Sequence, residues 1–552
     1  MARRLSIASI QANPTVGAIE PNEGLARRLI AEARQKGADL AVFSELFLIG
    51  YPPEDLALKP SALDACRSAL ERLAAETAGG GAVLMTLPWG GESRAPRNAV
   101  ALLCEGEIRQ VSFKSELPNY GVFDEKRIFE EGEAPVPFRL GETIFGAPIC
   151  EDIWAPDVAA SLRGQGAEIL LVPNGSPFRR SAAEERLAVA SARTAETGLP
   201  IVYVNQVGGQ DELVFDGGSF ALGADGALAM SLPLFAEAIG ISVWEKAGQG
   251  PWRCIEAPRA DWPVAPESAY RAMVLGLGDY VRKSGFAHVL LGLSGGVDSA
   301  LAMVAAVDAL GAEAVRAYML PSRYTSKESL ADAAEAARRC GVRLAEIPIE
   351  PAVEAFTSML AGEFAGRNAD ITEENLQARI RGVALMALSN KLGAMLLTTG
   401  NKSEMAVGYA TLYGDMCGGY NPLKDLYKVE VFEICRWRNA HRLLGGPASP
   451  IPEAILSKPP SAELRANQRD DDSLPPYGEL DAILMALVED DASLGAIVEA
   501  GHDRQSVAQA QRLLYGSEYK RRQAPPGVKL GRKSFGRDRR YPIVNGFRER
   551  LE

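Results

Sequence analysis

The chain has 552 residues, a length that exceeds what one hydrophobic core usually supports, so we expect two or three domains. Hydrophobic residues make up 47% and charged residues 24%, which is typical of a globular protein. The net charge of −12 argues against a general nucleic-acid surface, and no apolar run approaches the length of a membrane span.

Cysteine and histidine usage narrows the possible chemistry. Seven cysteines are scattered without a C-x-x-C pair, which favours a reducing, cytoplasmic setting over a disulfide framework or a zinc site. The three histidines are His288, His441 and His502, so residues 1–287 contain none. A Ser-His-Asp or Cys-His catalytic arrangement confined to the first half is therefore excluded.

The first half predicts a layered α/β domain over residues 1–245. Strands are expected at 5–12, 39–44, 82–87, 98–104, 107–113, 143–149, 168–173, 201–205 and 218–222. Helices are expected at 22–36, 61–78, 156–165 and 183–197.

Three of these predicted strands end in residues that could carry chemistry, namely Glu45, Lys114 and Cys150. Taken singly, each has a structural explanation: a solvated carboxylate, a snorkelling lysine and a small apolar filler. Taken together, they supply a thiol nucleophile, a carboxylate base and a cation for an oxyanion. In a domain without histidine, this combination predicts covalent catalysis by Cys150.

The trio and its flanking residues resemble the Glu-Lys-Cys triad of the nitrilase superfamily of C–N hydrolases. The resemblance implies a four-layer αββα sandwich and amide hydrolysis through a thioester. It implies that Glu45 takes the Cys150 proton and later activates water, while Lys114 holds the tetrahedral oxyanion. Asp152, two residues after the cysteine, is expected to fix the turn.

The segment Asn174-Gly-Ser-Pro-Phe178 is similar to the substrate loop of glutamine-specific members of that superfamily. This similarity implies that Tyr120 and Ser176 contact glutamine. Many relatives carry a lysine where this chain has Ala182, so one glutamine contact is left unassigned, with Arg179 and Arg180 nearby.

A stretch rich in Gly, Pro and Trp at 246–266 predicts a linker before a second domain at 267–552. Strands are expected there at 289–293, 314–319, 343–347 and 394–398, alternating with helices at 267–284, 298–310, 326–340, 351–361 and 373–391. This alternation predicts a doubly wound parallel sheet, in which ligands bind at the carboxyl ends of strands.

The turn Ser294-Gly-Gly-Val-Asp-Ser299 lies between a predicted strand and helix, where backbone N–H groups suit a phosphate. No lysine follows the glycines, so this is not a Walker A loop. An ordinary glycine-rich turn is the alternative. The turn resembles the pyrophosphate loop of the N-type ATP pyrophosphatases, which implies an adenine nucleotide α-hydrolase-like domain. The ATP contacts implied are Gly292, Leu293, Ser294, Gly295, Gly296, Val297, Asp298, Ser299 and Thr399.

Two carboxylates, Asp298 and Glu404, follow predicted strands and could hold Mg²⁺ against ATP phosphates. Gln377 and Arg381 share one helix face. The alternatives are a helix N-cap for Thr399 and a solvated surface for the 377–381 pair.

Further segments of the second half, at 414–415, 422–428, 458–464 and 519–526, look like the synthetase domain of NAD synthetases. With the first half, the resemblance is to the glutamine-dependent NAD synthetases and covers nearly the whole chain. It implies a ligase that uses ATP, deamido-NAD⁺ and glutamine or ammonia, with Mg²⁺. Asn375, Glu404 and Lys520 would contact deamido-NAD⁺, and the synthetase domain would form a homodimer.

Rival interpretations remain at this stage. One is an amidase whose second domain binds a regulatory nucleotide, and another is a non-catalytic scaffold. A third changes the acceptor, as in GMP- or asparagine-forming enzymes. The basic run at 529–540 could bind nucleic acid, although an acidic chain favours a mobile cover over ATP and the dinucleotide.

Overall fold

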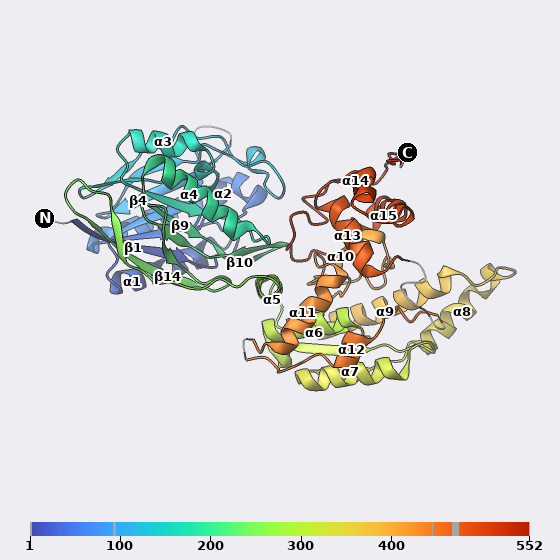
Figure 1. Ribbon diagram of the computed structural model, residues 1–552. Coiled ribbons are helices and arrows are strands. Elements are labelled where there is room, and N and C mark those ends of the chain that lie inside the picture. Colours follow the sequence, from blue (N-terminus) through green and yellow to red (C-terminus); the bar gives the residue numbers. More distant parts are fainter. Residues whose placement is uncertain (1–2, 92–94, 444, 466–467, 469–473, 551–552) are drawn as a thin grey trace. The chain divides into compact units, whose positions relative to one another are not determined.

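The computed structural model describes residues 3–91, 95–443, 445–465, 468 and 474–550 and divides the chain into two compact units, Met1–Pro263 and Val264–Glu552 (Figure 1). The expected linker at 246–266 lies mostly inside the first unit, because residues Arg253–Glu256 form strand β15 of its sheet. Among the described residues, no helix is long and apolar enough to cross a membrane.

The first unit contains two large mixed sheets. One has the order β15-β14-β1-β2-β3-β4-β5, with β1 (Arg3–Gln11), β2 (Leu40–Phe43), β3 (Ala82–Trp89), β4 (Arg97–Cys104), β5 (Glu107–Phe113) and β14 (Ala238–Lys246). The other has the order β13-β12-β9-β8-β7-β6, with β6 (Phe138–Leu140), β7 (Thr143–Gly146), β8 (Ile169–Asn174), β9 (Ile201–Asn205), β12 (Phe220–Leu222) and β13 (Leu228–Ser231). A separate hairpin joins β10 (Val207–Gln210) and β11 (Leu213–Asp216).

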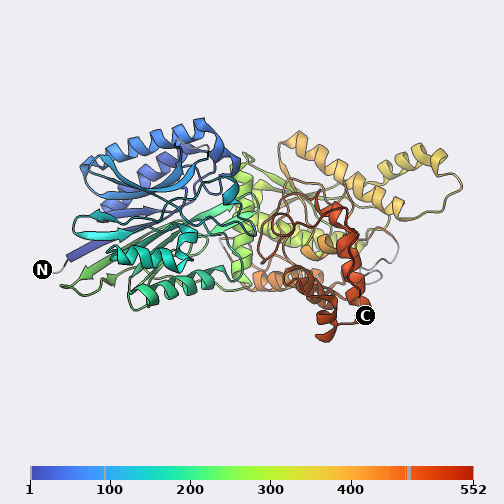
Figure 2. The same cartoon turned by 90° about the horizontal axis from the view of Figure 1, so that it is seen from above.

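Helices cover the outer face of each sheet. The blue helices α1 (Ile19–Gln35) and α2 (Pro60–Ala75) and the teal helices α3 (Pro156–Gly164) and α4 (Ala182–Thr197) lie on opposite sides of the strands in Figure 2. Short 3₁₀ turns complete the unit at η1 (Glu54–Leu58), η2 (Glu76–Gly79), η3 (Glu125–Arg127) and η4 (Cys150–Ile153). The expected four-layer αββα sandwich is confirmed.

Strand β2 shows why this sequence makes four layers. Its residues alternate: Leu40 and Val42 join the core between the two sheets, whereas Ala41 and Phe43 join the core under α1 and α2. Because successive side chains in a strand point to opposite faces, an apolar strand with this pattern must be covered on both sides. A third core lies between α3, α4 and the second sheet.

The second unit contains a four-stranded parallel sheet in the order β18-β17-β16-β19. Its strands are β16 (Val289–Gly292), β17 (Val315–Met319), β18 (Arg343–Glu346) and β19 (Met395–Leu397). The expected doubly wound sheet is confirmed. The order reverses between β16 and β19, and ligands of such sheets bind at this reversal.

Helices surround this sheet and extend the unit. They are α5 (Glu267–Lys283), α6 (Val297–Leu310), η5 (Ala312–Ala314), α7 (Lys327–Cys340), α8 (Glu350–Phe364), α9 (Ile371–Leu392), α10 (Lys402–Val407) and α11 (Lys428–Ala440). The chain continues with α12 (Glu453–Ser457), α13 (Tyr477–Val488), α14 (Leu494–Glu499), α15 (Arg504–Gly516) and α16 (Glu518–Arg521). Helix α8 and the start of α9 project from the rest of this unit (Figure 1).

Candidate active site

Cys150 is the first residue of η4, in the turn after β7. The expected strand at 143–149 is therefore too long, because the chain leaves the sheet after Gly146 to place the cysteine. Cys150 has φ of 47°, a left-handed conformation that few non-glycine residues adopt, and its side chain is buried. The Asp152 carboxylate accepts N–H groups from Ile149 at 2.9 Å and from Glu116 at 2.8 Å. Asp152 thus fixes the cysteine turn, as expected.

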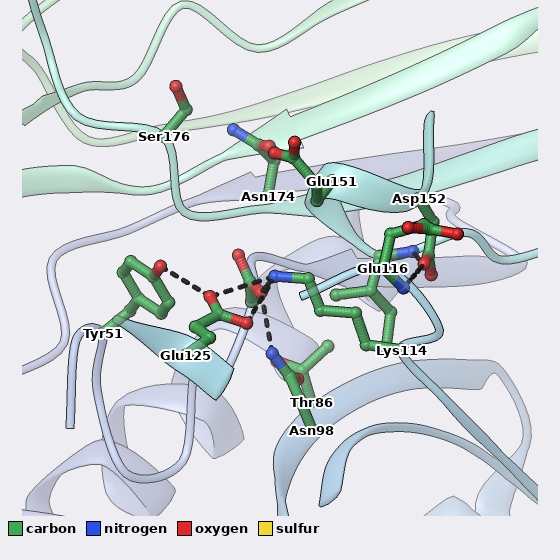
Figure 3. Close-up of polar contacts among 12 residues, drawn as sticks. Tyr51, Thr86, Asn98, Lys114, Glu116, Glu125, Glu151, Asp152, Asn174 and Ser176 are labelled. Carbon is green, nitrogen blue, oxygen red and sulfur yellow. Dashed lines mark hydrogen bonds and ion pairs between the residues drawn. The ribbon is translucent and has the colours of Figure 1, made fainter. Parts of the chain in front are cut away.

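Lys114 lies fully buried between two carboxylates (Figure 3). Its Nζ donates to Glu45 Oε1 at 2.7 Å and to the two oxygens of Glu125 at 3.0 and 2.8 Å. The Tyr51 hydroxyl donates to Glu125 Oε1 at 2.7 Å. The structure therefore brings Glu45 and Lys114 into direct contact across 69 positions of the sequence.

Electrostatics set the resting protonation of this cluster. Burial raises the pKa of the Cys150 thiol well above its usual value, and the Glu45 carboxylate adds to the rise while Lys114 opposes it. Burial alone would lower the pKa of Lys114, but Glu125 and Glu45 outweigh it and hold this pKa well above normal. Cys150 therefore rests as a thiol and Lys114 as an ammonium, so attack requires a base that takes the thiol proton.

Sequence reasoning missed Glu125. It lies in the charged segment Asp124-Glu125-Lys126-Arg127, which predicts a solvated turn, yet its side chain is buried against Lys114. Burial raises the pKa of Glu125 to about 7 against the opposing charge of Lys114. The one available signal was electrostatic: a lysine buried at a strand end needs more than one acceptor.

The two expected glutamine contacts lie in segments held next to the cysteine turn. The Tyr120 hydroxyl donates to the Glu151 carboxylate at 3.0 Å, beside the nucleophile in the sequence. Ser176 follows β8, and its backbone N–H donates to Asn205 Oδ1 at 3.2 Å. Burial raises the pKa of Glu151, and hydrogen bonding by Tyr120 lowers it in part.

Ala182, which stands where many relatives carry a lysine, cannot supply the missing glutamine contact. Ala182 is buried at the start of α4 and offers no polar group. Arg179 donates to Glu185 at 2.6 Å and to Ser181 at 3.3 Å, so its guanidinium is held by α4.

The second unit contains a cavity of about 320 Å³ at the carboxyl ends of its strands. All nine residues expected to contact ATP line it: Gly292, Leu293, Ser294, Gly295, Gly296, Val297, Asp298, Ser299 and Thr399. Glu404 lines it as well. The alternative role of Thr399 as a helix N-cap is wrong, because Asn401 caps α10 through a hydrogen bond from Glu404 N–H at 2.9 Å.

The glycine turn fits closely against the following elements. Gly295 has φ of +81°, and a Cβ atom there would lie 2.3 Å from the Ser329 carbonyl oxygen on α7. Gly296 N–H donates to Ser294 Oγ at 3.2 Å, and Ser294 Oγ lies 3.1 Å from Ser299 Oγ. This geometry places the loop at the N-terminus of α6, where anions bind favourably.

Asp298 and Glu404 meet through a lysine that sequence reasoning did not assign. Lys428 Nζ donates to Asp298, and it donates to Glu404 Oε1 at 3.3 Å. Asn401 Nδ2 also donates to Asp298, at 2.8 Å. The described residues contain no group of three or more His, Cys, Asp or Glu side chains suited to a metal. Two carboxylates that line the same cavity still fit Mg²⁺, which commonly takes few protein ligands together with phosphate oxygens and water.

Asn375 and Lys520, expected to contact a dinucleotide, do not line this cavity. Lys520 Nζ donates to the carbonyls of Gly408 and Ala410, both at 2.7 Å. Asn375 Oδ1 accepts from the Thr411 hydroxyl at 2.9 Å. Both side chains thus support the segment after α10.

The 377–381 pair is not a solvated surface. Gln377 donates to the Leu464 carbonyl at 3.0 Å, and Arg381, which lines the cavity, donates to the Leu320 carbonyl at 2.9 Å. Burial lowers the pKa of Arg381, with Asp415 opposing the shift.

The basic run at 529–540 is held by acids of its own unit. Lys529 Nζ donates to Asp538 at 2.7 Å, and Arg539 donates to Glu518 at 2.9 Å. None of these residues, all of which the structure describes, lines the cavity. In this structure ion pairs hold the run and none of its residues lines the cavity, and a movement of the run over bound ATP and dinucleotide stays a prediction.

Comparison with known proteins matches both units. Residues 6–248 match the carbon-nitrogen hydrolase family, and residues 269–524 match the NAD synthase family. Over the full length of both chains, the sequence is 53% identical to the glutamine-dependent NAD(+) synthetase of Rhodobacter capsulatus. It is 43% identical to that of Thermotoga maritima, again over all of both chains.

Solved structures agree with this match. The glutamine-dependent NAD⁺ synthetase of Acinetobacter baumannii, in complex with ADP, is 40% identical with a TM-score of 0.79, covering all of both chains. The enzyme of Cytophaga hutchinsonii, at 21% identity and a TM-score of 0.79, covers 99% of this chain and 98% of its own and shares the fold.

Fold and site together define a nitrilase-type hydrolase joined to an ATP-pyrophosphatase-type ligase in one polypeptide. A thiol site and a nucleotide cavity are each complete within their own unit. The chain belongs to the family of glutamine-dependent NAD(+) synthetases.

Proposed function

We propose that this chain uses ATP to amidate deamido-NAD⁺ to NAD⁺, with ammonia released from glutamine in its first unit. The products are NAD⁺, AMP, diphosphate and glutamate. One observation carries the proposal: a buried Glu45–Lys114–Cys150 site and a glycine-loop cavity occur in a chain 53% identical to one such enzyme over its full length. An amidase with a regulatory domain would not need the second site intact.

In the first unit, Cys150 attacks the side-chain carboxamide of glutamine while its proton passes to Glu45. Glu45 then gives this proton to the departing nitrogen, ammonia leaves, and water activated by the ionised Glu45 cleaves the thioester to glutamate. Lys114 provides the positive charge that stabilises the tetrahedral oxyanion. Because Glu125 accepts two of the bonds from Lys114, one donor can turn to the oxyanion while the ion pair persists. Tyr120 and Ser176 position the glutamine.

In the second unit, the nicotinate carboxylate of deamido-NAD⁺ attacks the α-phosphorus of ATP and expels diphosphate. Ammonia then attacks the acyl-adenylate carbonyl and releases AMP. The N–H groups of the Ser294–Ser299 turn hold the phosphates, and Thr399 contacts ATP. Lys428, at the cavity wall, brings a further positive charge to the leaving diphosphate. Glu404, Asn375 and Lys520 shape the dinucleotide site.

Asp298 and Glu404 would hold Mg²⁺, with Lys428 yielding its contacts to the ion. The bound ion would supply charge neutralisation for the phosphates. Their carboxylate oxygens, directed at one ammonium in this structure, form a donor set of the right type.

The second unit presents apolar surface that suits a homodimer. No residue of α8 is buried, although the helix carries Phe356 and Met359, and Met359 is 68% exposed. On α9, Ile371 and Val383 are 66% and 69% exposed. Exposed apolar side chains on neighbouring helices are typical of interfaces, so we assign the dimer contact to α8 and α9.

The cellular setting follows from the thiols. All seven cysteines lie among the described residues and are free, including Cys150. A catalytic thiol and six unpaired cysteines suit a reducing compartment, so we place the enzyme in the cytoplasm.

The test is an assay of NAD⁺ and AMP with ATP, Mg²⁺, deamido-NAD⁺ and either glutamine or ammonia. We expect NAD⁺ and AMP to form in equal amounts with both nitrogen sources. The Cys150→Ala variant should lose glutamine-driven synthesis by a factor of at least about 10³ and retain ammonia-driven synthesis. Absence of NAD⁺ from both nitrogen sources would refute the proposal.

Cys254→Ala is the matched control. Cys254 lies in the same unit on β15, half-buried, with its thiol directed to the Glu256 carbonyl. This variant should keep both activities. Equal losses in the two variants would show that the thiol at Cys150 has no special role.

A further inference from the structure

The two oxygens of the Glu45 carboxylate have different surroundings. Oε1 accepts hydrogen bonds from Lys114 Nζ and from Asn98 Nδ2, each at 2.7 Å (Figure 3). Oε2 is buried and has no hydrogen-bond partner among the residues that the structure describes. A carboxylate oxygen that already accepts two hydrogen bonds, one of them from an ammonium group, is a poor proton acceptor. Oε2 is therefore the oxygen available to a proton.

The loop after β8 presents backbone, and no side chain, to Oε2 at Gly175. Gly175, in the loop after β8, approaches it so closely that a Cβ atom there would lie 3.1 Å from Oε2 and 3.0 Å from the Tyr51 ring. The Glu45 N–H donates to the Asn174 carbonyl at 3.4 Å, which keeps the loop against this face. A rotation of the carboxylate would exchange the two oxygens. Oε1, which accepts from Lys114 and Asn98, would then take the place of Oε2.

Asn98 is placed to prevent that exchange. It lies on β4, fully buried, and its backbone carbonyl accepts the Lys114 N–H at 2.9 Å. A single residue thus contacts both Glu45 and Lys114. Its own Oδ1 is buried without a partner among the described residues. Leaving the Asn98 amide oxygen without a hydrogen bond costs stability. The hydrogen bond that Asn98 Nδ2 donates to Glu45 is therefore kept at a cost to the stability of the core.

We propose that Asn98 is a positioning residue for glutamine hydrolysis, whose amide fixes Glu45 Oε1 so that Oε2 accepts the Cys150 proton. The inference rests on the glutaminase function proposed above. Asn98 acts through Glu45: it does not touch the nucleophile or the substrate, and it keeps the base correctly rotated.

The charges around Glu45 explain why a neutral donor matters. Lys114 is shared with Glu125, and the thiol of Cys150 and the carboxylate of Glu151 also act on the cluster. Two carboxylates face one ammonium, so the cluster carries an excess negative charge. Without the amide donor, only Lys114 holds Oε1, and the Glu45 carboxylate is free to rotate.

The experiment compares glutamine-driven with ammonia-driven NAD⁺ synthesis in the full-length Asn98→Leu variant, which keeps the volume and removes the donor. We expect kcat with glutamine to fall about 10- to 100-fold relative to the ammonia rate, as for loss of a hydrogen bond to a charged group. KM for glutamine should stay unchanged, because Asn98 acts on the base and does not contact the substrate.

Val100→Ala is the matched control, because Val100 is buried on the same strand and does not contact Glu45. It should lower the melting temperature and leave the ratio of the two rates unchanged. Asn98→Ala provides a second route if Asn98→Leu does not fold, as judged by loss of ammonia-driven synthesis.

An unchanged kcat with glutamine in either Asn98 variant would overturn the inference. A loss confined to KM, or an equal loss of the rate ratio in Val100→Ala, would overturn it as well. Failure of the wild-type protein to hydrolyse glutamine would instead contradict the proposed function.

Discussion

At the scale of single residues, the buried charges of the first unit cost stability. Lys114 and Glu45 are fully buried, and Glu125 is nearly so. Removing such ions from water costs several kcal/mol each, and their attraction repays this only when the geometry is good. The short contacts to Lys114 meet that condition, yet a hydrophobic cluster of equal volume would be at least as stable. Chemistry is therefore the reason for keeping these charges.

Glu125→Gln should change how stability depends on pH. Burial raises the pKa of Glu125 from about 4.5 to about 7, so the folded state binds this proton more tightly than the unfolded state. The resulting stability is present below pH 4.5 and is lost as pH rises through 7. Glutamine cannot ionise, so relative to the variant the wild type should lose roughly 1 to 3 kcal/mol between these limits.

Thermal unfolding of both proteins between pH 4.5 and pH 8 measures this difference. Parallel pH curves would contradict the prediction. The variant should also hydrolyse glutamine more slowly, because Lys114 loses one of its two carboxylate partners.

Some residues of the thiol site could be recognised from the local sequence pattern, and others could not. Glu45, Lys114 and Cys150 follow predicted strands, and their residue types fit a known chemistry, so the sequence indicated them. Glu125 and Asn98 belong to a charged turn and to a strand, and nothing nearby in the sequence marks them. Their roles arise from contacts across 11 and 53 positions.

At the scale of elements, strand ends and glycine turns place the chemistry. The turn between β16 and α6 shows the tightest fit, since Gly295 combines φ of +81° with close contact to the backbone of α7. A side chain there must distort the loop that holds the phosphates.

Gly295→Ala should therefore abolish NAD⁺ synthesis with both glutamine and ammonia, lowering the rate by at least about 100-fold because the loop is displaced. The control is Gly311→Ala: Gly311 has φ of +86° but no atom within 4 Å of its would-be Cβ. It pays only the conformational cost of about 1 kcal/mol and should stay active. Calorimetric titration with ATP checks both variants, and normal ATP binding by Gly295→Ala would contradict the argument.

Element boundaries show where periodicity fails. The expected strand at 143–149 ends at Gly146, because an apolar run cannot reveal where the chain leaves a sheet. Strands β6, β10, β11, β13, β14 and β15 were not predicted. All of these except β14 have only three or four residues, which is too short for alternation to identify them.

At the scale of the whole molecule, the proposed dimer contact lies on α8 and α9. Val383→Asp, at a 69% exposed position of α9, should produce monomers by placing a charge in the apolar contact. Light scattering coupled to size-exclusion chromatography measures the mass directly. Val544→Asp is the control, since Val544 is 94% exposed near the C-terminus. A wild-type monomer, or an unchanged dimer in Val383→Asp, would contradict the assignment.

The sequence by itself determined the class of each unit and the chemistry of each site. Strand and helix periodicity, glycine turns and catalytic residue types are local properties, so a layered α/β unit with a thiol site followed by a doubly wound nucleotide-binding unit could be predicted, while the αββα arrangement was implied by the family resemblance. Motif resemblance then selected the family, which the full-length match confirms.

Only the tertiary structure decided which side chains form hydrogen bonds and ion pairs with one another. It assigned Glu125 to Lys114, Asn98 to Glu45 and Lys428 to Asp298, and it removed the basic C-terminal run from the cavity. These contacts join residues from separate elements through space. Their strength depends on burial and on distances of about 3 Å, which no pattern along the chain encodes.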